Sequence, residues 1–357
     1  LRLLTHTDGD ILAFLPGVGE IRAATAALEG AAGRIADVVP LYGNLPAAAQ
    51  DRALVPGPRR RVVLATNVAE SSVTVMGVRV VVDTGLARIP RFDRATGLNR
   101  LDVVPISRAA ADQRAGRAGR EGPGVCLRLW AESAHASRPA FEEPEVRRLD
   151  LSRALLDVRG FGEPDPRRFP WFEAPPEAHL AEAEALLSAL GAVTAEGGLT
   201  ARGRAMLALP LPPRLGALVV EGARQGIAAA AALAAALLSE PDADRPRADG
   251  FSATAGAKGA DFGAWVWALG SASAPAGPTG RLRHVQQALL DDLRATGQDA
   301  SATSAAEWDT AFARAVLAGF PDRVAKVREP GSRKARMVGG HGLALSHPTP
   351  QEFLVAL

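Results

Sequence analysis

The chain has 357 residues, of which 47% are hydrophobic and 22% charged, so it is a folded protein with room for two or three domains. This composition excludes a disordered tail. The formal net charge is only +2, so any binding of a nucleic acid has to be local.

Lysine and cysteine are both rare in this chain. Lysine occurs only at Lys258, Lys326 and Lys334, so the basic side chains are almost all arginines. The single cysteine, Cys126, cannot form an internal disulfide, which agrees with a reducing compartment.

Neither a secretion signal nor a membrane span is predicted. The N-terminal LRLLTHTDGD carries charges through any apolar region. The most membrane-like run, residues 226–238, is shorter than the roughly 17 residues that cross a bilayer. We therefore expect a cytoplasmic protein without membrane contact, and the lack of an initiator methionine suggests a piece of a longer polypeptide.

Short apolar runs in residues 1–150 predict strands, and helix-like stretches separate them. Most of these runs are apolar on both faces, which is typical of a parallel sheet covered by helices. We therefore predict an α/β domain. The runs are ILAFLP (Ile11–Pro16), VVPLY (Val38–Tyr42), RVVLAT (Arg61–Thr66), RVVVDT (Arg79–Thr84) and GVCLRLW (Gly124–Trp130).

One insertion breaks this alternation. LARIPRFDRATGLNRLDVVPI (Leu86–Ile106) predicts two strands around a turn at Asp93–Gly97. A projecting β-hairpin and an ordinary extension of the sheet would both give this pattern.

After about residue 150 helical patterns dominate, so the chain is predicted as α/β followed by mainly α. Ala178–Val193 predicts an amphipathic helix, TAEGGLT a tight hairpin and ARGRAMLAL a further helix. This order fits a winged-helix module, whose sparse charge favours packing over the reading of bases. A helical bundle is predicted to follow, and then short strands and turns from Asp322 onward.

The segment DQRAGRAGR places arginines at three-residue intervals, Arg114, Arg117 and Arg120, with Gly116 and Gly119 between them. Each glycine costs a helix about 1 kcal/mol relative to alanine, so stability alone does not explain the pattern. A helix would spread the arginines over one broad face, and the glycines would let another surface come close. Guanidinium groups fork onto phosphate oxygens, so this face predicts phosphate binding.

No loop that cradles phosphates accompanies these arginines. The pattern GxxxxGK[ST] fails at every lysine, and Pro16–Arg22 lacks the third glycine of a dinucleotide fingerprint. No acidic DExH box is present, and the histidines and the cysteine make no zinc pattern, so no metal held by this chain is expected. The arginines therefore predict one half of a phosphoryl-transfer site whose other half lies elsewhere.

These segments together resemble the DEAH/RHA branch of superfamily 2 helicases, and within it the bacterial HrpB-type helicases. Residues 65–85 (ATNVAESSVTVMGVRVVVDTG) resemble motif V and residues 113–120 (QRAGRAGR) motif VI. PLYGNLP (Pro40–Pro46) and FLPGVGEI (Phe14–Ile21) resemble the motif IV region. The similarity continues through WFEAPP (Trp171–Pro176) and FPDRVAKVR (Phe320–Arg328), so it covers nearly the whole chain.

The resemblance implies an organisation into domains. Residues 1–150 would be the second RecA-like lobe, 151–210 a winged helix, 211–320 a ratchet-like helical bundle, and 321–357 the start of a family-specific C-terminal region. The first RecA-like lobe would be missing here, and it would hold most of the ATP and its Mg²⁺. The partners implied are that lobe and a single strand of RNA or DNA, with no membrane.

The resemblance also assigns roles to residues of this sequence. Arg117 and Arg120 would act as fingers on the γ-phosphate, and Gln113 would place the attacking water. The implied ATP contacts are Arg114 in a supporting role, Thr74 near the ribose, and Gly116. The implied nucleic-acid contacts are Thr66, Asn67, Gly17 and, on the hairpin, Arg91 and Arg94, with Arg100 beside them.

Two positions depart from the family pattern. Met76 stands where many relatives place an acidic residue that holds the ribose, and Leu54 where some relatives have an aromatic residue that stacks on adenine. Both substitutions weaken recognition of the sugar and the base, so a loose nucleotide selectivity is expected.

Three functions are compatible with the sequence. The leading interpretation is the C-terminal portion of an ATP-dependent RNA helicase, inactive in hydrolysis on its own. The alternatives are a non-catalytic nucleic-acid-binding scaffold derived from a helicase lobe, and a winged-helix transcription regulator.

Overall fold

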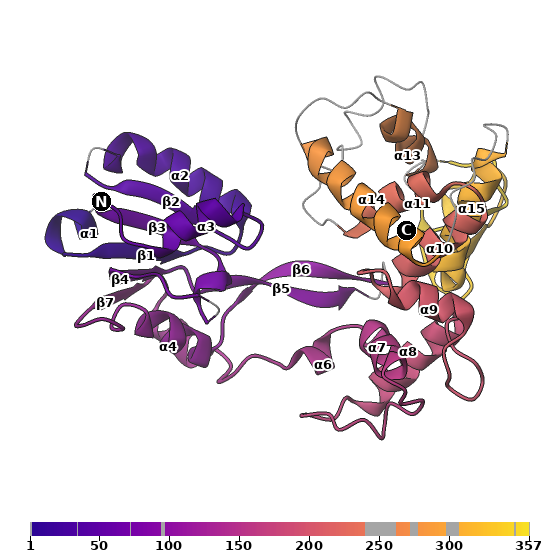
Figure 1. The fold of residues 1–357 in the computed structure, drawn as a ribbon, viewed down its shortest axis with the longest axis horizontal. Coiled ribbons are helices and arrows are strands. Elements are labelled where there is room, and N and C mark those ends of the chain that lie inside the picture. The colour runs from indigo at the N-terminus through magenta and orange to yellow at the C-terminus, as the bar shows by residue number, and fades with distance from the viewer. Residues whose placement is uncertain are drawn as a thin grey trace. The chain divides into compact units, whose positions relative to one another are not determined.

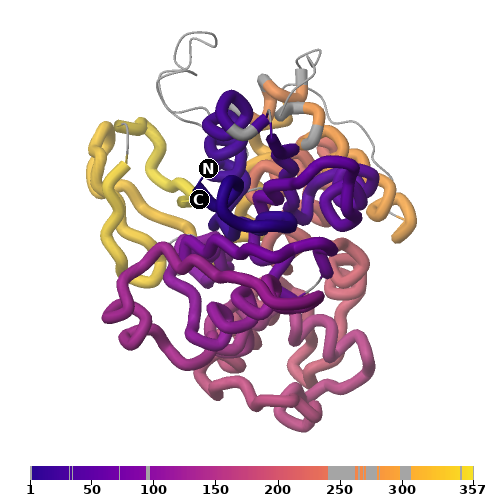
Figure 2. Tube along the Cα trace, turned by 90° about the vertical axis from the view of Figure 1, so that its left-hand side faces the viewer, coloured from indigo at the N-terminus to yellow at the C-terminus, as the bar shows by residue number. Residues whose placement is uncertain are grey.

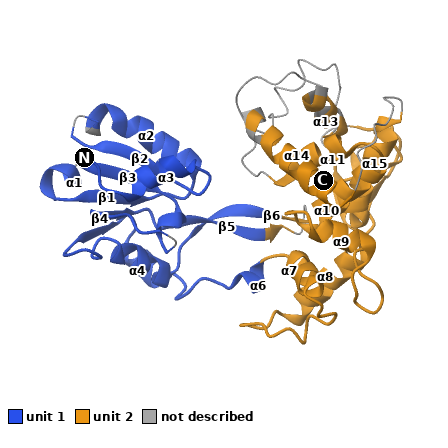
Figure 3. Cartoon of the chain, in the orientation of Figure 1, with its two compact units in different colours: residues 1–91, 99–148 blue, residues 92–98, 149–357 orange. Residues whose placement is uncertain are grey.

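The computed structural model describes residues 2–33, 35–71, 73–93, 97–239, 262–271, 278–297, 307–345 and 348–356. The chain forms two compact units (Figure 3). The first unit comprises residues 1–91 and 99–148, and the second comprises residues 92–98 and 149–357.

The first unit is built on a five-stranded parallel sheet in the order β2-β3-β1-β4-β7 (Figure 1). The predicted parallel α/β domain is confirmed, and each strand lies within two residues of the run that predicted it. The strands are β1 (Asp10–Phe14), β2 (Asp37–Leu41), β3 (Arg61–Ala65), β4 (Val78–Asp83) and β7 (Val125–Arg128). The helices are α1 (Arg2–His6), α2 (Val18–Ala32), α3 (Ala47–Leu54), η1 (Asn67–Ala69), α4 (Arg108–Gly116), α5 (Glu132–Ala136) and α6 (Glu145–Arg148).

Alternating residues of the central strands fill two cores, one on each face of the sheet. On β1, Leu12 and Phe14 join the core that contains Ala53 of α3. Ile11 points to the other core, with Ile21 of α2. This alternation explains why these strands are largely apolar on both faces.

The edge strand β7 does not follow this rule, because it pairs with β4 alone. Val125 is 53% exposed and Leu127 43% exposed, whereas Cys126 between them packs against the core. Burial raises the pKa of the Cys126 thiol, with the charge of Asp83 adding to the rise, so this cysteine is a packing residue.

The insertion between β4 and α4 forms a two-stranded hairpin, as predicted, made of β5 (Leu86–Asp93) and β6 (Leu98–Pro105). Its base is closed by Arg138, whose Nη1 donates to the carbonyls of Gly85 and Ile106, each at 2.8 Å. The same guanidinium lies 4.3 Å from the centre of the Trp130 ring. Gly85 has a positive φ of 72°, and a Cβ there would lie 2.6 Å from Trp130, so only glycine fits.

The second unit contains the predicted helices in the predicted order. Helix α8 ends at Ala189, earlier than the expected Val193, because Gly191 takes a positive φ of 66°. The TAEGGLT hairpin closes through a bridge between Val193 and Leu199. The helices are α7 (Ser152–Gly160), α8 (Glu177–Ala189), α9 (Ala201–Leu207), α10 (Pro213–Arg224), α11 (Ala228–Ser239), α13 (Phe262–Ser271), α14 (Pro278–Ala295), α15 (Trp308–Gly319) and η2 (Pro321–Arg323).

Helices α10 and α11 form the buried centre of this unit. Nearly every residue of α10 is buried, and α11 contains the alanine-rich run that was predicted to be a buried helix. None of the helices in the described ranges is long and apolar enough to cross a membrane.

The C-terminal residues fold into a four-stranded antiparallel sheet in the order β10-β9-β8-β11 (Figure 2, yellow). One face carries a small core that includes Ala325, Val327 and Ala335. The opposite face is exposed. The strands are β8 (Val324–Val327), β9 (Lys334–Met337), β10 (Gly342–Ala344) and β11 (Phe353–Val355).

Candidate functional site

The arginine-rich segment forms α4 and the turn that follows it. The helix begins at Ser107, whose hydroxyl accepts a hydrogen bond from the Ala110 amide at 3.1 Å. The three arginines differ in exposure: Arg114 in the last turn of the helix is buried, Arg117 just after it is partly buried, and Arg120 in the following turn is exposed. The prediction that the three arginines share one face is therefore wrong, because carboxylates inside the domain attract Arg114.

Arg114 is 1% exposed and lies between two carboxylates. Its Nε donates to Glu70 Oε2 and its Nη1 donates to Asp83 Oδ1, both at 2.9 Å. Its guanidinium also lies 4.7 Å from the centre of the Phe14 ring. The guanidinium is thus enclosed by groups of the first unit, and the predicted contact of Arg114 with ATP stays a prediction.

Arg117 is held by backbone carbonyls of the loop that follows β3. Its Nε donates to the Glu70 carbonyl and its Nη1 to the Val73 carbonyl, both at 2.9 Å, and its Nη2 also reaches Glu70. Burial lowers the pKa of Arg117, the charge of Arg120 adds to the lowering, and Glu70 opposes it. The positive charges of Arg117 and Arg120 therefore repel each other, and a bound anion would reduce this repulsion.

The side chains of Arg120 and Gln113 are both exposed. Within the described ranges, neither side chain forms a hydrogen bond or ion pair. A Cβ added at Gly116 or at Gly119 would meet no atom within 4 Å. Packing inside this part of the chain therefore does not require either glycine, and the surface next to Arg120 is open.

The loop after β3 carries the predicted nucleic-acid and ribose contacts. Asn67 and Thr74 are exposed and Thr66 is partly buried. The Thr66 hydroxyl does not cap η1. Neither the Thr66 nor the Asn67 side chain bonds to any residue in the described ranges, which leaves both for a ligand. Thr66 stands at the carboxyl end of β3, the end at which open parallel sheets bind ligands.

The two departures from the family pattern differ in position. Met76 is 48% exposed, near Thr74 along the loop. Leu54 packs against the core of the first unit, so it offers no platform for a base.

The remaining predicted contacts lie on other segments of the chain. Gly17 is buried, and a Cβ there would lie 2.6 Å from Arg88 Nε and 2.9 Å from Glu20 Oε2. The glycine therefore makes room for the Arg88–Glu20 ion pair. Arg91 is exposed on β5, and Arg94 lies outside the described residues.

Sequence reasoning missed the two carboxylates that organise the arginines, Glu70 and Asp83. Both lie inside the motif V segment, at or beyond the carboxyl ends of β3 and β4. The available signal was the requirement that a buried arginine be paired, together with a strand of apolar residues ending in aspartate.

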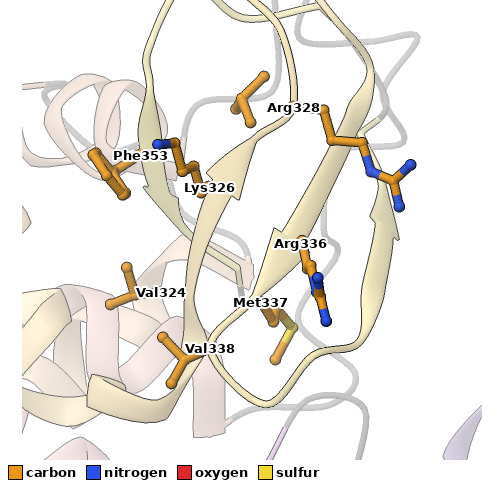
Figure 4. A pocket seen from close by; sticks show the side chains of 8 residues that line it. Val324, Lys326, Arg328, Arg336, Met337, Val338 and Phe353 are labelled. Carbon is orange, nitrogen blue, oxygen red and sulfur yellow. The ribbon is translucent and has the colours of Figure 1, made fainter.

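A second polar surface lies on the exposed face of the C-terminal sheet. Phe353, Lys326 and Arg336 stand next to one another across β11, β8 and β9, and they line a groove of about 470 Å³ (Figure 4). The Lys326 ammonium lies 5.6 Å from the centre of the Phe353 ring and 3.2 Å from Glu352. Lys326 and Arg336 are like charges in direct cross-strand contact, an arrangement that destabilises a sheet.

The side chains of the first unit fit the phosphate end of a nucleotide better than a metal ion. Arg120 and Gln113 are donors directed to an open surface. In the part of the chain that the structure describes, no group of three His, Cys, Asp or Glu residues could hold a metal ion.

Most of the parallel sheet, and the arginine-rich segment bonded to the loop after β3, lie in the part of the chain that matches a helicase family. Residues 1–122 match the helicase conserved C-terminal domain. The chain belongs to the DEAH/RHA helicases of the HrpB type, which confirms the resemblance seen in the sequence.

Two relatives from Escherichia coli strain K12 show the similarity. The ATP-dependent RNA helicase HrpB is 43% identical over 241 residues, which are 67% of this chain and 30% of HrpB. The ATP-dependent RNA helicase HrpA is 40% identical over 245 residues, which are 67% of this chain and 19% of HrpA. The chain therefore matches less than a third of either relative.

A solved structure agrees over almost the whole length. The crystal structure of the Escherichia coli DEAH/RHA helicase HrpB matches 99% of this chain and 42% of that one, with a TM-score of 0.72 and 36% identity. The fold is therefore an HrpB-like helicase fold with a parallel sheet and mixed helices.

Proposed function

We propose that this chain works as part of a longer ATP-dependent RNA helicase and supplies the arginine side of its nucleotide pocket. Arg120 is the finger that reaches the γ-phosphate, Arg117 joins it when released from the loop carbonyls, and Gln113 orients the attacking water. Arg114 holds the segment in place. The observation that supports this assignment most strongly is the open surface at Gly116, Gly119 and Arg120, which nothing in the described chain covers.

The chemistry follows from the charge of the transition state. ATP with Mg²⁺ supplies the phosphoryl group, and we assign its binding mainly to a first RecA-like lobe. The negative charge that spreads over the phosphoryl oxygens is stabilised best by donors already in position. Thr74 stands near the ribose, and Gly116 lets the facing lobe approach.

Nucleic acid is proposed to bind at the loop after β3 in the first unit and, separately, at the exposed sheet face in the second unit. Thr66 and Asn67 are free to bind the backbone, and Arg91 and Arg94 are proposed as further contacts. In the second unit, the groove offers cations for phosphates and Phe353 for a stacked base. RNA is chosen over DNA because the named relatives are RNA helicases.

The subdomain roles belong to the same proposal. Residues 151–210 form a winged helix that packs, residues 211–320 a ratchet-like bundle, and residues 321–357 the start of a C-terminal nucleic-acid-binding region. The proposed location is the cytoplasm.

The test is hydrolysis of ATP by the longer protein with Arg120→Ala. Loss of a finger is expected to lower kcat by about 10³-fold or more while RNA affinity stays within a few-fold. Arg108→Ala, an exposed arginine at the other end of α4, is the matched control and should leave kcat unchanged. Unchanged turnover in Arg120→Ala would contradict the assignment, and RNA binding by a wild type that hydrolyses no ATP would favour the scaffold.

A further inference from the structure

Glu70 connects three parts of the first unit by three different groups. Its amide donates to the Asn67 carbonyl at 2.9 Å, which closes the η1 turn. Its carbonyl accepts from Arg117 at 2.9 Å, and its carboxylate accepts from Arg114 at 2.9 Å. One residue therefore joins the proposed nucleic-acid contact, the proposed finger and the buried arginine.

The carboxylate of Glu70 is not needed to neutralise Arg114. Asp83 is fully buried and pairs with the same guanidinium at 2.9 Å, so the buried cation keeps a partner when Glu70 is removed. Glu70 is more exposed, at 19% of its side chain. The ion pair between Glu70 and Arg114 thus attaches the loop to α4, whereas Asp83 balances the charge of Arg114 in the core.

Fixing the loop fixes the acceptors of Arg117. Both of those acceptors, the Glu70 and Val73 carbonyls, belong to the loop, so a shift of the loop moves the guanidinium that is bonded to it. Thr66 and Asn67 begin the same loop, and the η1 hydrogen bonds connect them rigidly to Glu70. A ligand that displaces Asn67 would therefore change the position of Arg117.

We propose that Glu70 is a positioning residue, which ties the loop to Arg114 so that binding of nucleic acid at Thr66 and Asn67 sets the position of Arg117. This inference rests on the proposed function. Glu70 would contact neither the nucleotide nor the nucleic acid, and it would act on hydrolysis through Arg117.

The first test uses Glu70→Ala in the longer protein, with ATP hydrolysis measured with and without a single-stranded RNA oligonucleotide. RNA-stimulated kcat should fall by about 10-fold or more, since misplacement of a catalytic group by about 1 Å is costly. Hydrolysis without RNA, the Kd for RNA and the Tm should change little. Glu70→Gln, which keeps an acceptor of the same reach, should recover part of the stimulation.

Glu121→Ala is the matched control. The Glu121 carboxylate accepts from the Gly77 amide at 3.0 Å, at the other end of the same segment, and contacts neither Arg114 nor Arg117 in the described ranges. Stimulation should stay normal in this variant. Amide hydrogen exchange of this chain should speed up over residues 67–76 in Glu70→Ala and only near Gly77 in Glu121→Ala.

The inference is overturned if Glu70→Ala keeps full stimulation and unchanged exchange, or if stimulated rate, unstimulated rate and Tm fall together. A wild type without RNA-stimulated hydrolysis would refute the proposed function, and the coupling with it. A normal wild type with an unaffected Glu70→Ala refutes the role of Glu70 alone.

Discussion

The arginine segment of the first unit and the exposed sheet face of the second unit hold their cations in opposite ways. In the first unit, Arg114 and Arg117 are held by two carboxylates and two carbonyls, and each guanidinium has a fixed direction. In the second unit, Lys326 and Arg336 stand side by side on an exposed sheet face, with one exposed carboxylate, Glu352, against Lys326.

This difference fits the two tasks proposed for these surfaces. Stabilising a transition state requires donors at defined positions, so ion pairs that hold the segment carrying them, such as those of Arg114, are useful there. Binding a flexible phosphate backbone requires only positive potential and a surface for stacking, so loosely held cations suffice. The first unit therefore should fail when geometry is disturbed, and the second when charge is removed.

The largest loss of stability is expected when the buried ion pair between Asp83 and Arg114 is broken. Asp83→Asn takes the charge from a fully buried carboxylate and leaves Arg114 with only Glu70, so the free energy of unfolding should fall by about 3 kcal/mol. Urea denaturation measures it. Asp112→Asn, which breaks the exposed pair with Arg128, should cost less than about 1 kcal/mol. Equal losses in the two variants would contradict the contrast.

Removing charge from the sheet face should change binding and not folding. Lys326→Ala with Arg336→Ala should weaken binding of a single-stranded oligonucleotide by about 10-fold and reduce its salt dependence by about one charge per substitution. The Tm should stay level or rise, because two like charges that lie opposite each other across the strands are removed. Fluorescence anisotropy at several salt concentrations measures the affinity. Arg167→Ala, whose guanidinium is paired with Glu177 and Glu184, serves as the control and should leave affinity unchanged.

Arg214 of the second unit is held by hydrogen bonds in the same way as the arginines of the first unit. Arg214 is buried and holds Asp322 through two hydrogen bonds of 2.5 and 2.9 Å. Burial of Asp322 opposes its ionisation, but the hydrogen bonds and charge of Arg214 outweigh this and lower its pKa.

The lowered pKa of Asp322 makes the free energy of unfolding depend on pH. A lowered pKa in the folded state gives stability that is complete above the unfolded value of about 4 and is lost as the pH falls through the folded value. Because Asp322 is half exposed, the loss should not exceed about 1 kcal/mol. Between about pH 5 and pH 2, the Tm of Asp322→Asn should fall less with decreasing pH than the Tm of the wild type. An equal fall in the two proteins would show that the Arg214–Asp322 ion pair contributes nothing to stability.

The smallest effect concerns the glycines near Arg120. Gly116→Ala should stabilise this chain by about 0.5 kcal/mol, because the new Cβ meets nothing and alanine favours a helix. In the longer protein the same change should slow ATP turnover if another surface approaches there. Gly203→Ala is the contrasting variant: its Cβ would lie 2.0 Å from the Ala192 carbonyl, so it should destabilise. A Tm that falls in Gly116→Ala would show that this glycine has a role inside the chain.

Most of the fold could be predicted from the sequence because it follows local rules. Strands buried on both faces, such as β1 and β3, are apolar after their first residues, Asp10 and Arg61, and the second hairpin strand is preceded by Gly97, which has a positive φ. The exposed side chains of β7 could not be predicted, because its edge position depends on the strand order and not on its own residues.

The site was predictable only in part. The spacing of the arginines located the segment, but it did not reveal that Arg114 turns inward. That direction is set by Asp83 and Glu70, which are 31 and 44 residues away in the chain. Long-range pairing of this kind leaves no periodic signal in the sequence.

The central claim is that Arg117 and Arg120 complete a nucleotide pocket whose other walls belong to a neighbouring lobe. A structure of the longer protein with ADP and an aluminium fluoride mimic of the phosphoryl group tests it most directly. The account predicts both guanidinium groups within about 3 Å of the mimic, with Arg117 released from the Val73 carbonyl. It is contradicted if Arg117 stays on the loop carbonyls and Arg120 remains in solvent while the mimic is bound.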